Sequence, residues 1–236
     1  MNATRFRVSP IPFSDTKEWI LKKHYAHRIP SVSYAFGLFD DNMLVGVCTY
    51  GHPVTGSVKK MLGDEYYNSL LELNRLVVND NLPKNTLSWF VAQTFKLLPK
   101  PVPIVSYADT AYNHHGYIYQ ATNWIYTGTS EPFTDYKVKG YENLHNQSIC
   151  DMVGRADDNE NVSGKSRYKL LVEKFGADNV YKVERSLKHR YFMFLGNKRE
   201  VRRMMKALHY QIKPYPKGDN KRYDSSYTPT VQLTLF

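Results

Sequence analysis

Residues 106–128, SYADTAYNHHGYIYQATNWIYTG, combine side chains that can bind a metal, move protons or stack on nucleobases. Asp109 is followed closely by the adjacent imidazoles of His114 and His115. Imidazoles titrate near neutral pH, and carboxylate with imidazole ligands suits iron or zinc. Together with two residues from an earlier segment, these groups could form a metal site. The candidate metal ligands are His24, Tyr25 and Asp109.

The same stretch also allows acid–base chemistry without a metal. Asp109 could accept a proton as a general base, and Tyr119 could donate one as a general acid. A structural interpretation is open too, in which Tyr117, Tyr119 and Trp124 are core aromatics with their polar tips at the rim of the core. The residue types alone do not decide between a metal site, acid–base chemistry and a structural role.

A second candidate site follows the apolar run LLELNRLVV at residues 70–78. The loop NDNLPKN leads directly into the helical pattern TLSWFVAQTFKLL. The first amides of a helix attract anions, so a phosphate or pyrophosphate could bind there. An ordinary capped helix fits the same pattern, because the loop lacks a glycine-rich cradle. The candidate contacts are Lys84, Asn85, Thr86 and Ser88.

Basic residues are concentrated in the last quarter of the chain. Residues 185–236 hold 12 Lys or Arg and three acids, whereas residues 1–184 hold 20 basic and 19 acidic residues. Such asymmetry favours a polyanion partner, with a solvated basic face as the alternative. In NKREVRRMMKALHY the cations recur at three- and four-residue spacing, and nearby tyrosines could stack on bases. The candidate DNA-binding residues are Lys188, Arg190, Lys198, Arg199, Arg202, Arg203, Lys206, Lys217, Lys221 and Arg222.

The elements that must position these residues form a mixed α/β pattern. An amphipathic helix is expected over residues 14–27, and a hairpin turns at residues 40–42. A helix over residues 86–98 connects the apolar strands 70–78 and 101–109, so those strands are expected to be parallel. Ligands bind beyond the carboxyl ends of parallel strands. Both candidate sites follow such an end.

Composition sets the class of protein. With 42% hydrophobic and 14% aromatic residues, the 236-residue chain can bury a core. The two cysteines, Cys48 and Cys150, do not make a disulfide framework, and Cys48 sits in an apolar run typical of burial. No apolar run reaches the roughly 18 residues that a membrane span requires. We therefore expect a soluble intracellular protein with no membrane partner.

Several of these segments resemble the Mom family of bacteriophage DNA-modification proteins. The resemblance is carried by LLELNRLVVND, NTLSWFVAQTFKLL, IVSYAD, HHGYIYQATNWIYTG and KHRYFMFLG…YPKGDNKRYD, and the SYAD…HGYIYQATN block is its most specific part. The order of strands and helices is similar to that of GNAT-type acyltransferases. The resemblance implies a GNAT-like, mostly antiparallel central sheet flanked by helices. We expect residues 1–130 to form this catalytic core, and residues 131–236 to form a basic C-terminal extension packed on it.

The resemblance also implies an activity. Mom-like proteins convert the exocyclic amine of adenine in double-stranded phage DNA to a carbamoylmethyl, glycinamide-like derivative, which protects the DNA from host restriction. The implied donor is acetyl-CoA, or another acyl or aminoacyl group carried by CoA or tRNA, and the implied metal is iron. The implied location is the cytoplasm of the infected bacterial host. By the same resemblance, the residues expected to be catalytic are Tyr25, Ser106, Asp109 and Tyr119. Those expected to bind the donor are Leu76, Val77, Lys84, Asn85, Thr86, Ser88 and Asn123.

Two other functions fit the sequence. One is a non-catalytic nucleic-acid-binding phage protein that uses the same basic helix. The other is a GNAT N-acetyltransferase that acts on a protein or a small amine. A DNA-binding module has no use for an acyl donor, and an ordinary N-acetyltransferase leaves adenine unchanged. Measurements of donor binding and of the nucleoside composition of the DNA therefore distinguish the three candidate functions.

Overall fold

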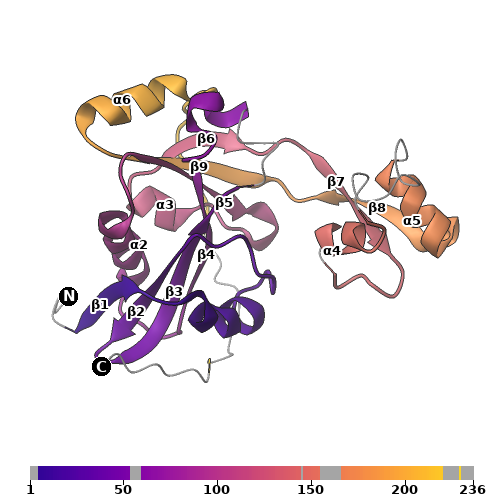
Figure 1. The fold of residues 1–236 in the computed structure, drawn as a ribbon, viewed down its shortest axis with the longest axis horizontal. Helices are drawn as coiled ribbons and strands as arrows, with labels where there is room; N and C mark the ends of the chain where they lie inside the picture. Colours follow the sequence, from indigo (N-terminus) through magenta and orange to yellow (C-terminus); the bar gives the residue numbers. More distant parts are fainter. Residues whose placement is uncertain (1–4, 54–59, 145, 155–165, 220–228, 230–236) are drawn as a thin grey trace. The chain divides into compact units, whose positions relative to one another are not determined.

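The computed structural model describes residues 5–53, 60–144, 146–154, 166–219 and 229 of the chain. Residues 1–129 and 188–236 form one compact unit, and residues 130–187 form a second. The second unit is thus inserted between two segments that belong to the first (Figure 1). The sequence placed a boundary near residue 130 but did not anticipate the return of the chain at residue 188.

The first unit is built on a seven-stranded sheet with the order β1-β2-β3-β4-β5-β9-β6 (Figure 1). Its β4–β5 pair is parallel and its other neighbouring strands are antiparallel. This confirms the predicted mixed α/β fold with a mostly antiparallel sheet, and the predicted parallel pair. The strands are β1 (Phe6–Pro10), β2 (Tyr34–Asp40), β3 (Met43–Gly51), β4 (Leu71–Val78), β5 (Val102–Asp109), β6 (Ile125–Thr129) and β9 (Lys188–Leu195).

Strand β9 corrects the prediction of a C-terminal extension packed on a finished core. It lies inside the sheet between β5 and β6, and it pairs with β5 over its whole length, from Asp109 with Lys188 to Val102 with Leu195. Removing it would separate β6 from the rest of the sheet. The residues after position 187 are therefore part of the first unit.

Helices cover both faces of this sheet. Neighbouring residues of a strand point to opposite faces, so they pack against different helices. On β5, Ile104 belongs to a core cluster with Phe90 of α2 (Thr86–Leu97), whereas Val105 belongs to a cluster with Met204 of α6 (Lys198–Ala207). Because both faces are buried, the β5 sequence is a continuous apolar run rather than an alternating one. Further short helices of this unit are η3 (Asp64–Tyr66), η4 (Thr110–Tyr112) and α3 (Tyr117–Ala121).

The N-terminal helix is shorter than predicted. A 3-10 turn, η1 (Phe13–Thr16), leads into a turn of π-helix, η2 (Trp19–Lys23), and the helix ends at His24. Ser14 does not cap it: its hydroxyl contacts the Asp15 carboxylate inside the first turn. The chain leaves the helix before the residues expected at its C-terminal end. His24 and Tyr25 therefore lie in a loop.

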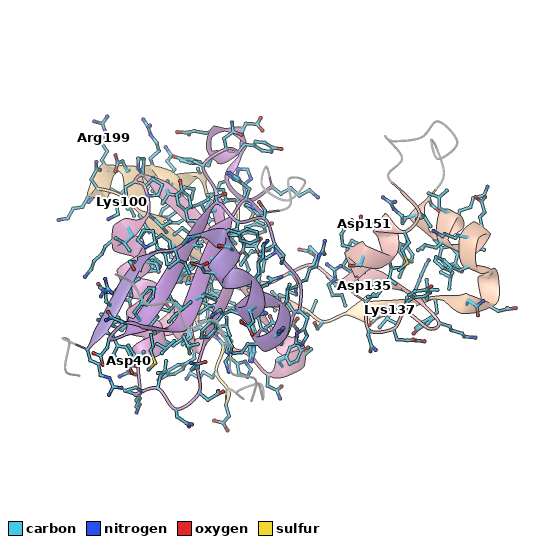
Figure 2. All side chains as sticks on the ribbon, turned by 60° about the horizontal axis from the view of Figure 1, so that its bottom comes forward. Asp40, Lys100, Asp135, Lys137, Asp151 and Arg199 are labelled. Carbon is cyan, nitrogen blue, oxygen red and sulfur yellow. The ribbon has the colours of Figure 1, made fainter. Side chains whose placement is uncertain are left out.

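The second unit pairs β7 (Phe133–Val138) with β8 (Val180–Arg185) and adds α4 (Asn146–Asp151), α5 (Arg167–Phe175) and η6 (Ala177–Asn179). Val138, Ile149, Leu171 and Val180 form its core. Asp135 and Lys137 lie on β7 (Figure 2), and Asp135 accepts hydrogen bonds from Arg185 of β8. This unit is therefore held by its own small core and a cross-strand ion pair.

Within the described ranges, no helix has the length and apolar character needed to cross a membrane.

Candidate functional site

The parallel strands β4 and β5 separate shortly after they pair. Their register holds only two pairs, Leu71 with Ile104 and Glu72 with Val105. Beyond this point the Ser106 hydroxyl, rather than a backbone amide, reaches the Leu73 carbonyl oxygen, at 2.7 Å. The separation opens the sheet at the carboxyl ends of the two strands, which is where the sequence placed a site.

A bulge on β4 turns further polar side chains toward the opening. The β3–β4 register passes from Tyr50–Leu73 to Thr49–Arg75, which leaves Asn74 as the extra residue. Asn74 donates to the Ser31 carbonyl oxygen at 2.7 Å, and Arg75 donates to the Arg28 carbonyl oxygen at 2.8 and 3.2 Å. These bonds hold the segment that follows His24 and Tyr25 against the sheet.

A cavity of about 510 Å³ occupies the opening. It extends from β4 and the first turn of α2, on one side, to His24, Tyr25, Tyr107 and Lys188 on the other. Its size suits a small molecule or a single nucleobase together with part of a donor. Of the predicted site residues, the cavity is lined by His24, Tyr25, Leu76, Val77, Lys84, Asn85, Thr86, Ser88, Tyr119 and Lys188.

Glu72 lines the cavity at the point where the strands separate. Burial raises the pKa of this carboxyl to about 7, and the nearby cations Arg75 and Lys188 partly oppose the shift. A carboxylate with a pKa near neutrality is suited to accept a proton at physiological pH. The sequence analysis did not single out Glu72, although a charged residue inside the run LLELNRLVV was a signal that could have identified it.

Tyr119 and Ser106 form a buried hydroxyl pair beside the cavity, with their oxygens 2.7 Å apart. Ser106 Oγ is placed to donate to both the Leu73 carbonyl oxygen and the Tyr119 oxygen, and its one proton serves one of these acceptors at a time. Burial raises the pKa of Tyr119 above its ordinary value, and the bond to Ser106 acts in the opposite direction. The tyrosine therefore holds its proton at neutral pH. If it gives that proton away, Ser106 can turn and donate to the resulting anion.

His24 and Tyr25 line the cavity but do not assemble the predicted metal site with Asp109. Their rings are stacked, with centroids 4.4 Å apart, and His24 Nδ1 accepts a hydrogen bond from the Ala26 amide. Burial lowers the pKa of His24 to about 3, so this imidazole is neutral. In the described part of the chain, no three His, Cys, Asp or Glu side chains are arranged to hold a metal ion. The prediction of iron gains no support.

Asp109 lies at the end of β5 but is not among the residues that line the cavity. Its carboxylate caps η4 by accepting a hydrogen bond from the Ala111 amide at 3.0 Å, and it lies 4.0 Å from Lys188 Nζ. These contacts give Asp109 a structural task. Its predicted role as a general base stays a prediction.

The first turn of α2 faces the cavity with its N-terminal amides. Asn85 precedes the helix in the left-handed conformation, and no side chain caps the helix there. Thr86 is 2% exposed, lines the cavity, and its Oγ1 has no hydrogen-bond partner. A buried hydroxyl without a partner is costly. Together with the first amides of the helix, it matches an anionic ligand group.

Asn123 does not line this cavity. It lies in a second, open groove of about 320 Å³ between α2 and α3, with Trp89 and Phe95. Asn85 and Ser88 line both spaces, so the groove continues from the first turn of α2. A ligand with its anionic part at α2 could thus extend an aromatic group over Trp89.

The predicted DNA-binding residues fall into four groups. Arg190 is 6% exposed, donates to Thr127 Oγ1 at 3.0 Å and stacks on the ring of Tyr210, so it is a structural residue and cannot grip DNA as predicted. Lys188 lines the cavity. Lys221 and Arg222 lie outside the described residues. The exposed members are Lys198, Arg199, Arg202, Arg203, Lys206 and Lys217.

Five of the exposed cations lie on α6, and Figure 2 shows Arg199 extending outward from that helix. An Asn197–Glu200 capping box fixes the start of α6. Strand β9 runs from Lys188 at the cavity to Leu195, so the end of the strand that leads to α6 lies about 24 Å from Lys188. The predicted stripe is therefore a surface feature of α6.

The chain matches the Mom protein family over residues 5–217. The methylcarbamoylase mom of Escherichia phage Mu is 28% identical over 217 residues, which cover 89% of this chain and 83% of that protein. Similar solved structures include a putative acetyltransferase of Acinetobacter baylyi, with 12% identity, a TM-score of 0.44, and coverage of 83% of this chain and 95% of that one. An N-acetyltransferase of Staphylococcus aureus has 10% identity, a TM-score of 0.43, and coverage of 81% and 99%.

Proposed function

This chain belongs to the Mom protein family, and from that membership we propose that it is a transferase that modifies the exocyclic N6 amine of adenine in double-stranded DNA. The observation that carries the proposal is the cavity at the separation of β4 and β5. It combines a base of near-neutral pKa, Glu72, with a neutral acid, Tyr119. Those are the two groups that a transfer to an amine requires. The proposed product is carbamoylmethyl adenine, and its proposed use is protection of phage DNA from restriction.

The proposed division of labour has two proton transfers. Glu72 accepts the proton that N6 loses as a bond forms between N6 and the acyl carbon of the donor, and this step yields an N6-acyl adenine. With a glycyl donor the adduct N6–CO–CH2–NH2 has the same atoms as the carbamoylmethyl product N6–CH2–CO–NH2, so a subsequent rearrangement completes the product without a further reactant. Tyr119 gives its proton to the leaving atom as the bond between that atom and the acyl carbon breaks, and Ser106 then donates to the tyrosine oxygen. Neither step needs a metal.

The proposed donor is an acyl or aminoacyl group carried by an anionic, nucleotide-bearing molecule such as acetyl-CoA or an aminoacyl-tRNA. Such a carrier supplies an activated carbon and a good leaving group. Thr86 Oγ1 and the first amides of α2 would hold its phosphate, with Lys84 nearby. The groove at Trp89 and Asn123 would hold its base.

The proposal is tested by mass spectrometry of nucleosides from DNA. The full chain is expressed in a bacterial host, and the digested genomic DNA is compared with DNA from cells that carry the empty vector. We expect a heavier deoxyadenosine in the first sample only. Unmodified adenine, with acetylated protein or small amines instead, would favour an N-acetyltransferase. Unmodified adenine with DNA bound and no donor bound would favour a binding module.

Thr86→Val should weaken donor binding more than chemistry. The substitution keeps the shape of the side chain and removes Oγ1, the buried hydroxyl without a partner. A hydrogen bond to a charged group contributes about 1.5–3 kcal/mol, so we expect the KM for the donor to rise roughly 10- to 150-fold with little change in kcat. The melting temperature should not fall, because no internal hydrogen bond is lost. Steady-state kinetics at varied donor concentration and a thermal melt measure both.

Thr94→Val is the matched control on the same helix. Its hydroxyl is equally buried but is bonded to the Tyr50 hydroxyl and the Val91 carbonyl, at 2.6 and 2.7 Å. This variant should lose stability and keep its donor KM. If the two variants raise the donor KM alike, the hydroxyl at position 86 has no direct part in binding.

The basic helix α6 is proposed to grip the DNA backbone beside the modified base. It follows the end of β9 that lies about 24 Å from Lys188, which corresponds to roughly seven base pairs at about 3.4 Å each. Contacts at that distance can orient a duplex without touching the base that reacts. They carry affinity rather than base specificity.

Arg199→Ala/Arg202→Ala should therefore change binding and leave the chemistry intact. We expect weaker DNA binding at all sequences and a salt slope of log K that is smaller by about 2, because each phosphate contact contributes about 0.9. Modification at saturating DNA should be unchanged. Fluorescence anisotropy across a salt series measures the slope. Lys96→Ala removes an exposed cation from α2 and should leave it unaltered; an equal change in both variants would show that net charge, not α6, binds DNA.

A further inference from the structure

The N-terminus of α3 presents a large aromatic ring to solvent at the mouth of the cavity. Tyr117 is 62% exposed, the highest value among the large hydrophobic side chains in the described ranges, and it also lines the cavity. Tyr119 follows two residues later, on the other side of the helix, and is directed inward to Ser106. A single exposed apolar side chain is common on protein surfaces, but this ring combines its exposure with a place in the lining of the cavity.

The backbone under Tyr117 is fixed on both sides. Gly116 has a φ of 73°, and a Cβ at this position would collide with the ring of Tyr191, so only glycine fits. The Tyr191 hydroxyl donates to the His115 carbonyl oxygen, and Gln120 Nε2 donates to the same oxygen at 2.9 Å. Tyr117 is thus an exposed side chain on an immobilised backbone.

The C-terminal segment strengthens this support and brings a cation to it. Tyr215 donates to the Trp124 carbonyl oxygen at 2.6 Å, and the Pro216 carbonyl accepts from Gln120 at 3.2 Å. Gly218 lies so close to the His115 ring that a Cβ there would collide with it. The exposed Lys217 lies between Pro216 and Gly218, which contact Gln120 and His115, the residues that flank Tyr117 in sequence. Lys84 and Lys188 add positive charge around the cavity.

We propose that Tyr117 stacks inside the DNA duplex, in the place that the adenine leaves when it is extruded into the cavity. The proposal rests on the proposed function and names how the protein reaches a base in a duplex. Extruding a base costs unstacking and unpairing energy, and an aromatic side chain can recover part of it by stacking on the neighbouring bases. A ring on a rigid backbone does so with little loss of its own freedom. The cations nearby match the phosphates that flank the gap.

The test compares substrates in which extrusion is costly or easy. Wild type, Tyr117→Ala and Tyr117→Phe are assayed on a matched duplex, on a duplex with each adenine mispaired, and on the single strand. On the matched duplex we expect kcat/KM of Tyr117→Ala to fall roughly 5- to 160-fold, which is about 1–3 kcal/mol of stacking at 1.36 kcal/mol per factor of ten. The loss should shrink on the mispaired duplex and vanish on the single strand. Tyr117→Phe keeps the ring and should behave as wild type.

A second readout does not depend on catalysis. In a set of matched duplexes each adenine in turn is replaced by 2-aminopurine, whose fluorescence rises when the base leaves the stack. Wild type should brighten one or more of these duplexes, and Tyr117→Ala should not, at protein concentrations that saturate both. Phe133→Ala, which removes another exposed aromatic ring from the second unit, is the matched control and should brighten them like wild type.

The outcomes separate this proposal from the proposed function. If wild type modifies adenine and Tyr117→Ala is equally impaired on duplex and single strand, or unimpaired on both, the stacking role is wrong and the function stands. If wild type brightens 2-aminopurine through Tyr117 but modifies no adenine, the stacking role stands and the function is wrong. If wild type neither modifies adenine nor brightens the probe, both are wrong.

Discussion

Glu72→Gln should abolish most of the transferase activity while the protein becomes more stable at alkaline pH. The carboxyl lines the cavity where β4 and β5 separate, and burial raises its pKa to about 7. General acid–base catalysis typically contributes about 10²- to 10⁴-fold, and glutamine cannot accept the proton that N6 loses. We expect a loss of that order in kcat, with DNA and donor affinity kept. Nucleoside mass spectrometry of single-turnover reactions measures it.

The pH dependence follows from the same raised pKa. Below about pH 7 the carboxyl is protonated and cannot act as a base, so the wild-type rate should rise about tenfold per pH unit and level off above about pH 7. The residual rate of Glu72→Gln should lack this rising limb of the pH–rate profile. The folded protein favours the neutral carboxyl, so its contribution to stability is present below the ordinary value of 4.5 and is lost as pH rises through about 7. Glutamine stays neutral, and the variant should therefore melt at a higher temperature than wild type at pH 8.

Asp80→Asn gives the opposite pattern and serves as the control. Asp80 is another carboxylate at the cavity, but it pairs with Lys23 Nζ at 3.0 Å, and the Lys23 side chain is 1% exposed. Neutralising it weakens the compensation of a buried charge, which destabilises the fold. We expect a lower melting temperature with the pH limb intact. A lost limb in Asp80→Asn, or an intact limb in Glu72→Gln, would remove Glu72 from its assigned role.

The sequence predicted the scaffold of this site better than its chemistry. The run LLELNRLVV was predicted as a buried strand parallel to residues 101–109, and β4 and β5 confirm it. That prediction succeeds because apolar runs and a helical crossover determine such pairs locally. Because this segment was treated as an apolar run, its two charged residues, Glu72 and Arg75, were not considered as functional residues. Two charges inside a buried strand are seldom tolerated without a partner or a task, and that rule could have identified them.

The charge count along the sequence predicted one basic DNA-binding surface, but the fold places its residues in different parts of the molecule. Lys188 and Arg190 were grouped with the α6 cations because they are close in sequence. In the sheet, Lys188 lies opposite Asp109 at the cavity, and Arg190 is enclosed by Thr127 and Tyr210. These partners come from β6 and from the segment after α6. No local pattern encodes them, because β9 pairs with strands far from it in sequence.

Tyr119→Phe is the second substitution with a large expected effect, and it reports on the leaving group. Tyr119 keeps its proton at neutral pH because burial raises its pKa, and Ser106 is placed to donate to the oxygen once the proton has gone. Phenylalanine fills the same space without the acid. We expect a loss in kcat of about 10²-fold when the leaving atom is a strongly basic oxygen, because such an atom cannot depart unprotonated. Single-turnover rates with purified donors measure it.

The size of that loss distinguishes the two proposed classes of donor. A thiol has a pKa of about 8.5, so the thiolate released from a CoA thioester needs the acid far less than the alkoxide released from an aminoacyl-tRNA ester. The expected loss with a thioester is therefore only about tenfold, a small fraction of the general-acid effect. Tyr126→Phe is the matched control: its hydroxyl lies 2.8 Å from His189 Nδ1 and is not among the cavity-lining groups, so kcat should stay unchanged. Equal losses in Tyr119→Phe and Tyr126→Phe would assign Tyr119 to packing. A loss confined to Tyr119→Phe and larger with the ester than with the thioester would establish it as the acid.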